Sequence, residues 1–141
     1  AYIGKDGNKK TPVMVHRAIL GSMERFIGVL TEHYAGAFPL WLSPVQVLVL
    51  SVGENFNKYG EKVLTELKNA SIRAEMDKTN ETLGKKIRLG KTQKVPYIIV
   101  VGEKEQESET VTVNPRDKKE QMALKLEDFI HQIKQEITEK K

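Results

Sequence analysis

The amino-acid sequence predicts an α/β fold: a mixed, mostly parallel β-sheet flanked by helices. Two observations carry this prediction. From residue 45 onward, short apolar runs that are typical of buried strands alternate with amphipathic segments of helical period. A helix between two strands returns the chain to the end of the sheet where the first strand began, so the two strands run parallel. Such crossover connections are right-handed. In addition, two strand-like runs, 97–102 and 110–113, flank the polar stretch "EKEQESE" and indicate an antiparallel hairpin.

The first part of the chain, residues 1–40, supplies one strand and one helix. "TPVMV" (11–15) predicts a short strand, and the apolar residues that follow recur on one helical face. Ser22 is the expected N-cap of that helix and Gly36 its expected stop signal. A strand and one helix cannot close a hydrophobic core alone, so we expect residues 1–40 to be the remnant of a larger domain.

The second part, residues 41–141, predicts a complete domain. Pro39 and Pro44 bracket Trp41 at its start, a pattern typical of a junction between two structural units. The elements expected after it, in chain order, are a buried strand at 45–52, a helix at 54–69, a half-covered strand at 72–76, a helix at 82–94, a buried strand at 97–102, a polar turn, a hairpin strand at 110–113 and a final helix whose apolar stripe runs from Met122 to Ile137. A segment of this length can bury a core of its own.

The composition excludes several classes of protein. Hydrophobic residues make up 39% of the 141 residues and charged residues 30%, as expected of a soluble globular chain. The absence of cysteine excludes a disulfide framework, a thiolate nucleophile and a cysteine-based zinc site within the chain. No apolar run approaches the ~20 residues of a membrane-spanning helix, and the polar start lacks the apolar core of a secretory signal. We therefore expect a cytoplasmic protein.

The positive charge of the chain is concentrated in one stretch. The formal net charge is only +4, but five basic residues and no acidic one lie between positions 84 and 94: Lys85, Lys86, Arg88, Lys91 and Lys94. The last three follow one another at three-residue intervals, which places them on one broad helical face. Such a face is either an ordinary solvated surface or a surface that attracts phosphates.

Polar residues near this basic stretch favour RNA as the partner. Asn80 and Arg88 flank the start of the predicted helix, and Glu105 lies in the predicted turn after a buried strand. Amide and guanidinium groups bond to unpaired base edges, while a carboxylate accepts from the N–H donors of guanine or uracil. This combination fits single-stranded RNA better than the backbone of a duplex.

The first part of the chain gives weaker signals. His16 follows the predicted strand and is either an ordinary structural histidine or a ligand, but zinc needs about three protein ligands and nothing nearby supplies the others. Arg25 either pairs with Glu32 or contacts a phosphate. "GSMER" is not a Walker loop, and the three histidines have no recognisable partners for a Ser-His-Asp triad.

Three stretches resemble a known family. They are "PVMVHRAILGSMERFIGVLTEHYAGAFPLWLSPVQV", "DKTNETLGKKIR" and "KVPYIIVVGEKE". Together they resemble the threonyl-tRNA synthetases of bacterial type, which are class II aminoacyl-tRNA ligases, over essentially the whole chain. The stretch 16–47 is specific to that family. The later part is shared more loosely with the prolyl, histidyl and glycyl relatives.

The resemblance gives the first part of the chain a role. "HRAILGSMERF" is similar to the third motif of a class II catalytic domain, in which Arg25 would bind ATP. Gly21 and Ser22 would line the adenylate pocket. His16 matches a ligand of the Zn²⁺ ion that holds the amino group and hydroxyl of threonine, which would explain the rejection of valine.

The resemblance also implies a division of the chain. Residues 1–40 would be the C-terminal remnant of the catalytic domain, and residues 41–141 the anticodon-binding domain. The other zinc ligands and the first two motifs are absent, so the chain would be the C-terminal part of a homodimeric ligase that attaches threonine to tRNA with ATP and Zn²⁺. By itself we expect this part to be catalytically inactive, free of bound cofactors and monomeric.

The expected partner of the second part is the anticodon loop of threonine tRNA. The family's anticodon contacts fall on Asn80, Arg88 and Glu105 of this sequence. Lys85 and Lys91 lie beside them in the basic stretch and are expected to contact RNA as well.

The sequence departs from the family at one anticodon position. Where these enzymes often have an arginine after the hairpin strand, this chain has Asn114, followed by Pro115 and Arg116. Either Arg116 takes over the base-reading role or one base contact is altered. We favour the first alternative.

Two other functions stay open at this point. A free-standing accessory module with the anticodon-binding fold would bind RNA without catalysis, although the presence of both His16 and Arg25 argues against it. A signalling or ligand-binding α/β domain would place its ligand beyond the carboxyl ends of the strands. A receiver-like site there needs clustered acids, but the first strand of the second part is followed by Ser51, Val52 and Gly53.

Overall fold

The computed structural model describes residues 1–118 and 120–140. The chain divides into two compact units, the first Ala1–His33 and the second Tyr34–Lys141. In the described part of the chain, no helix combines the length and apolar character that crossing a membrane requires.

The first unit contains a small hairpin and one helix. Strands β1 (Tyr2–Ile3) and β2 (Lys9–Lys10) pair antiparallel, and helix α1 spans Met23–His33. The Ser22 hydroxyl accepts a hydrogen bond from the Arg25 amide at 3.3 Å, which confirms the predicted N-cap. The helix ends shortly before Gly36, whose φ of +76° lies in the left-handed region that favours glycine.

The prediction of a strand at residues 11–15 is wrong. Residues 11–18 adopt no regular secondary structure, and Val13 and Val15 are 91% and 78% exposed. An extended segment becomes a strand only when a neighbour satisfies its backbone amides and carbonyls, whereas β1 and β2 pair with each other. The helix likewise has no buried residue among those described, so this unit has no core of its own.

The second unit is built on a five-stranded sheet in the order β4-β3-β5-β6-β7. The strands are β3 (Val47–Ser51), β4 (Ala74–Asp77), β5 (Tyr97–Val101), β6 (Thr110–Pro115) and β7 (Met122–Lys125). β3 pairs parallel with both β4 and β5, and β6 pairs antiparallel with both β5 and β7. The sheet is therefore mixed, with a parallel half and an antiparallel half.

Helices connect these strands. They are the short 3₁₀ helix η1 (Glu54–Phe56), followed by α2 (Asn57–Asn69), α3 (Leu83–Thr92), α4 (Glu103–Ser108) and α5 (Leu126–Thr138). The β3–α2–β4 and β4–α3–β5 crossovers confirm the predicted α/β fold class with its sheet flanked by helices.

Two expected elements of the second unit differ from those observed. The stretch "EKEQESE" was expected to be a polar turn but forms α4, because the Glu105 carboxylate accepts the Gly102 amide at 3.0 Å and caps the first turn. Met122 was expected in the final helix but belongs to β7. There Met122 and Leu124 alternate with more exposed residues and only the stripe from Leu126 onward is helical.

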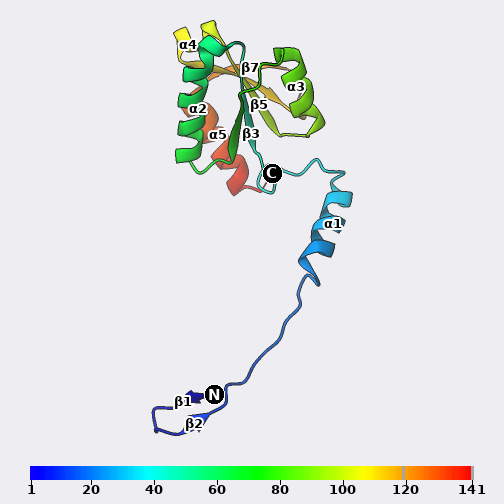
Figure 1. The fold of residues 1–141 in the computed structure, drawn as a ribbon, viewed down its shortest axis with the longest axis vertical. Helices are drawn as coiled ribbons and strands as arrows, with labels where there is room; N and C mark the ends of the chain where they lie inside the picture. Colours follow the sequence, from blue (N-terminus) through cyan, green and yellow to red (C-terminus); the bar gives the residue numbers. More distant parts are fainter. Residues whose placement is uncertain (119, 141) are drawn as a thin grey trace. The chain divides into compact units, whose positions relative to one another are not determined.

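The two faces of the sheet are covered differently. Helices α2 and α5 lie on one face and α3 on the other (Figure 1). The larger core lies under α2 and α5 and includes Val63, Phe129 and Ile133, all of them fully buried. Phe129 of α5 meets Tyr97 of β5 edge-on, with ring centroids 5.5 Å apart. The smaller core lies under α3, and this asymmetry leaves part of the sheet open.

Candidate nucleic-acid interface

A polar strip of β6 lies on the face that α3 covers only in part. Val111 and Val113 are fully buried in the larger core, so the intervening Thr112 and Asn114 face the opposite side. Asn114 lies opposite Ile98 in the strand register, and Ile98 belongs to the smaller core under α3. Thr112 and Asn114 are both half-buried. The strip therefore runs beside the helix and is reachable from solvent.

Helix α3 places most of its basic residues in solvent. Arg88 and Lys91 are exposed, and Lys85 forms an ion pair with Glu81 at 2.6 Å. Arg88 lines a shallow hollow of about 520 Å³ together with Thr79 and the apolar part of the helix surface. Lys91 lines a second hollow, of about 350 Å³, in which Asn114 also lies. The helix thus borders the polar strip with positive charge.

Asn80 is presented by a tight turn after β4. The Asp77 carboxylate accepts hydrogen bonds from the Thr79 amide at 2.8 Å and from its hydroxyl at 2.6 Å. Burial acts to raise the pKa of Asp77, but these two hydrogen bonds and the charge of Lys86 outweigh it and lower the pKa below 3.8. Asn80 is exposed and lines a hollow of about 330 Å³ at the carboxyl ends of β3 and β4.

Glu105 is held rigidly at the other side of the polar strip. One carboxylate oxygen accepts the Gly102 amide, and the other accepts the Thr112 hydroxyl at 2.7 Å. The residue is half-buried in α4, not in a turn. Because both oxygens are already oriented by the fold, their remaining lone pairs are presented in a fixed direction.

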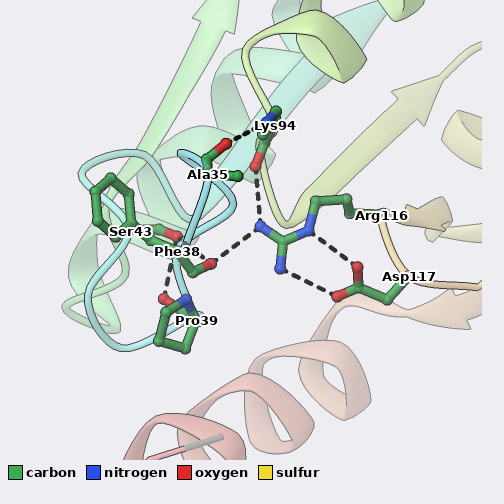
Figure 2. A network of polar contacts seen from close by, with 7 residues as sticks. All are labelled: Ala35, Phe38, Pro39, Ser43, Lys94, Arg116 and Asp117. Carbon is green, nitrogen blue, oxygen red and sulfur yellow. Dashed lines mark hydrogen bonds and ion pairs between the residues drawn. The ribbon is translucent and has the colours of Figure 1, made fainter. Parts of the chain in front are cut away.

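Arg116 has a different environment from the other candidates (Figure 2). Its Nε and Nη2 fork onto the Asp117 carboxylate, each at 3.1 Å. Its Nη1 donates to the backbone carbonyls of Phe38 at 3.0 Å and of Lys94 at 3.1 Å. Only 19% of the side chain is exposed. Four of the five N–H donors of the guanidinium are therefore engaged within the protein.

The Phe38 carbonyl belongs to a segment, residues 35–43, that side chains of the second unit hold in place. The Lys94 ammonium donates to the Ala35 carbonyl, and the Ser43 hydroxyl donates to the Phe38 carbonyl at 3.2 Å (Figure 2). Arg73 donates to the carbonyls of Trp41 and Ser43 at 2.8 and 2.9 Å. The segment has no regular structure, so these side chains supply the partners that a helix or sheet would otherwise provide.

The candidate residues of the first unit are all exposed. Arg25 and Gly21 are at the surface, and the Ser22 hydroxyl is engaged as the helix cap. His16 lies in the irregular stretch, and the described residues contain no cluster of three or more His, Cys, Asp or Glu side chains suited to a metal ion. A single imidazole does not make a zinc site, so the residues of this chain do not fit the ion by themselves.

The structural environment of two residues near the candidate contacts was missed in the sequence. Lys86 is buried, although it belongs to the basic stretch. Its spacing from Leu83, Ile87 and Gly90 places it on the apolar stripe of α3. This spacing is the feature of the sequence from which its burial could have been predicted. Thr112 anchors Glu105, and the alternation of "TVTV" indicated that it shares a face with the residue two positions later.

This unit is an α/β domain with a basic helix beside an open, polar sheet face, an arrangement that attracts single-stranded nucleic acid. Residues 46–136 match the model of the family described as "Anticodon binding domain". The chain belongs to this anticodon-binding domain family.

Known proteins similar to this chain carry related names. A threonine–tRNA ligase of Carboxydothermus hydrogenoformans is 50% identical over 99% of this chain, and one of Pelobacter propionicus is 56% identical over 92%. The chain spans only 22% and 20% of the length of these two relatives. The solved RNA-binding domain of threonyl-tRNA synthetase from Cryptosporidium parvum matches 85% of this chain, and the chain covers 30% of it, with a TM-score of 0.78 and 38% identity.

Proposed function

We propose that this chain recognises the anticodon loop of threonine tRNA as the C-terminal part of a threonine–tRNA ligase. The observation that carries the proposal is the open face of the sheet, where the polar strip of β6 lies between the basic side of α3 and the anchored Glu105. Unpaired bases present donors and acceptors that such polar side chains complement, while exposed lysine and arginine attract the backbone. The names of the relatives support threonine tRNA as the particular partner.

Within this proposal, Asn80, Arg88, Glu105 and Asn114 contact bases, and Lys85 and Lys91 contact phosphates. Arg116 is not among the base contacts, because four of its donors are already used by the protein. Its geometry supports the alternative in which one base contact is altered. Asn114 then occupies that position with a shorter, uncharged side chain.

The catalytic activity belongs to a longer enzyme. There, Arg25 with Gly21 and Ser22 would bind ATP, and His16 would contribute one ligand to Zn²⁺ alongside ligands outside this chain. We propose that this enzyme is a cytoplasmic homodimer that joins threonine to its tRNA. The 141-residue chain should therefore show no threonine-dependent exchange of pyrophosphate into ATP.

The test is binding of this chain to the anticodon stem-loop of threonine tRNA across a salt series, with a second stem-loop whose central G is replaced. We expect tighter binding to the first, roughly tenfold, and a log–log salt slope of about −0.7 per phosphate neutralised. Arg88→Ala should abolish the preference. Lys68→Ala, an exposed lysine on α2, is the matched control and should preserve it.

Each other outcome is informative. Equal and purely salt-driven binding to both stem-loops would mean that the domain supplies charge and that specificity needs the rest of the enzyme. Absence of binding to either stem-loop would contradict the proposed function.

A further inference from the structure

Lys86 is the one charged residue buried among the described residues, with 6% of its surface exposed. It lies on the inner side of α3, on the same stripe as Leu83, Ile87 and Gly90, where the packing of the helix would be served by an apolar side chain. Desolvating an ammonium group costs several kcal/mol unless partners compensate. The position therefore needs an explanation beyond packing.

The protein supplies few partners for this ammonium group. Its one hydrogen bond among the described residues goes to the Asp77 backbone carbonyl at 3.5 Å, which is longer than a normal N–H···O hydrogen bond. No carboxylate lies within ion-pair distance of it in the described part of the chain, and Asp77, whose pKa its charge lowers, acts on it over a longer distance. An ammonium group carries three donors, so at least two of them are left without an acceptor from the protein.

Lys86 also lies between the two hollows that the candidate RNA contacts line. It lines the hollow of Asn80, at the carboxyl ends of β3 and β4, and it lines the hollow of Arg88 on α3. Asp77 and Thr79 form the turn between these hollows. A ligand atom in either hollow is thus close to the positive charge of a largely buried lysine, whose interactions are screened less by solvent than those of an exposed lysine.

We infer that Lys86 is an RNA-contacting residue that donates to an acceptor oxygen of the anticodon loop held between Asn80 and Arg88. The acceptor is a phosphate oxygen or a base carbonyl, both of which complement the free N–H donors of the ammonium group. This inference rests on the proposed function and adds to it a buried contact that determines affinity more than the exposed lysines do.

The sequence provides a matched pair of variants for the test. Lys86→Met and Lys85→Met remove one positive charge each from adjacent positions of α3 and keep most of the aliphatic side chain. Only Lys86 is buried, while Lys85 is exposed and paired with Glu81. The measurement is the affinity of the 141-residue chain for the threonine anticodon stem-loop over a salt series, together with the urea midpoint of each variant.

We expect Lys86→Met to weaken binding roughly tenfold or more and Lys85→Met to weaken it about twofold. The urea midpoint of Lys86→Met should change little, because the desolvation cost that the substitution removes offsets the lost attraction to Asp77. A loss of about 0.7 in the salt slope would identify a phosphate as the acceptor, and an unchanged slope would identify a base carbonyl.

Binding by Lys86→Met within twofold of wild type would overturn the inference while leaving the proposed function intact. Failure of the wild-type chain to bind the stem-loop would overturn both. If Lys86→Met does not fold, the wild-type chain decides the question through the ¹⁵N resonance of the Lys86 ammonium. That resonance should shift when the stem-loop is added, and an unshifted resonance in the saturated complex would overturn the inference.

Discussion

The Arg116 guanidinium donates to the Phe38 carbonyl at 3.0 Å across 78 positions of the sequence. The same Nη1 reaches the Lys94 carbonyl, and the other two guanidinium nitrogens hold Asp117 (Figure 2). Arg116 thus joins the end of β6, the loop before β5 and the irregular 35–43 segment. These contacts give Arg116 a structural role in the domain, although the residue lies only two positions after Asn114, a candidate RNA contact.

Arg116→Ala should therefore lower stability without changing base preference. We expect the free energy of unfolding to fall by about 2 kcal/mol, because hydrogen bonds to a charged group are lost and two carbonyls lose their donors. Backbone amides of residues 35–43 should exchange faster with solvent. Urea unfolding and hydrogen exchange measure both effects, with Lys118→Ala, an exposed neighbour, as the control. Loss of the preference for the central G at unchanged stability would contradict this role.

The sequence predicts most of the fold because periodicity reports burial. β3 and β5 are buried as continuous apolar runs, and the stripes of α2 and α5 face the larger core. The failures have local causes. β7 is only four residues long and continues directly into α5, so its alternation merges with the helical pattern. The stretch 11–15 has the pattern of a strand without a partner in the first unit.

The site is less completely predictable. Three-residue spacing places Arg88 and Lys91 on an exposed helical face, as the structure shows, but Lys94 lies beyond the end of α3 and donates to the Ala35 carbonyl instead. The environment of Arg116 depends on backbone carbonyls of residues distant in sequence, and a carbonyl has no side-chain signature by which it can be recognised. Helical spacing places Lys86 on the buried face of α3. A charged residue is not expected in a core, however, so its burial was not predicted.

Gly90→Ala should destabilise the packing of α3 on the sheet. A Cβ at this position would lie 2.9 Å from both Leu48 Cδ2 and Ile98 Cδ1, which are buried in the smaller core. Relieving two such contacts at once requires these buried side chains or the helix to shift, and we expect a loss of about 1–3 kcal/mol in the free energy of unfolding. Gly84→Ala is the matched control in the same helix, because nothing lies within 4 Å of its Cβ.

For Gly84→Ala we expect unchanged stability or a gain of about 0.5 kcal/mol, since alanine has the higher helix propensity. Urea unfolding of the two variants provides the comparison. Equal stabilities would show that the smaller core accommodates the extra methyl group without cost.

The stabilising contribution of the Asp77 carboxylate should be lost in acid. Its pKa in the folded state is below the ordinary value of 3.8, so the ionised carboxylate is favoured by folding. The resulting stability is fully present above 3.8 and is lost as the pH falls through the lower, folded-state pKa. The difference in unfolding free energy between wild type and Asp77→Asn should therefore be constant near neutral pH and shrink below 3.8.

The measurement is urea unfolding of both proteins at matched pH values. Other carboxylates titrate equally in the two proteins and cancel in the difference. A difference that grows as the pH falls would contradict the lowered pKa.

Asn114→Arg should strengthen recognition of RNA. Asn114 shares its hollow with Lys91, and its amide makes only a long hydrogen bond, 3.5 Å, to the Ile98 carbonyl. A guanidinium there would add a planar fork of N–H donors to the hollow that Lys91 lines. We expect roughly tenfold tighter binding to the threonine anticodon stem-loop and a larger preference over the stem-loop with the central G replaced. Asn114→Lys carries the same charge without the planar fork, so it should tighten binding to both stem-loops equally. If Asn114→Arg also tightens binding to both equally, the position contributes charge and not base recognition.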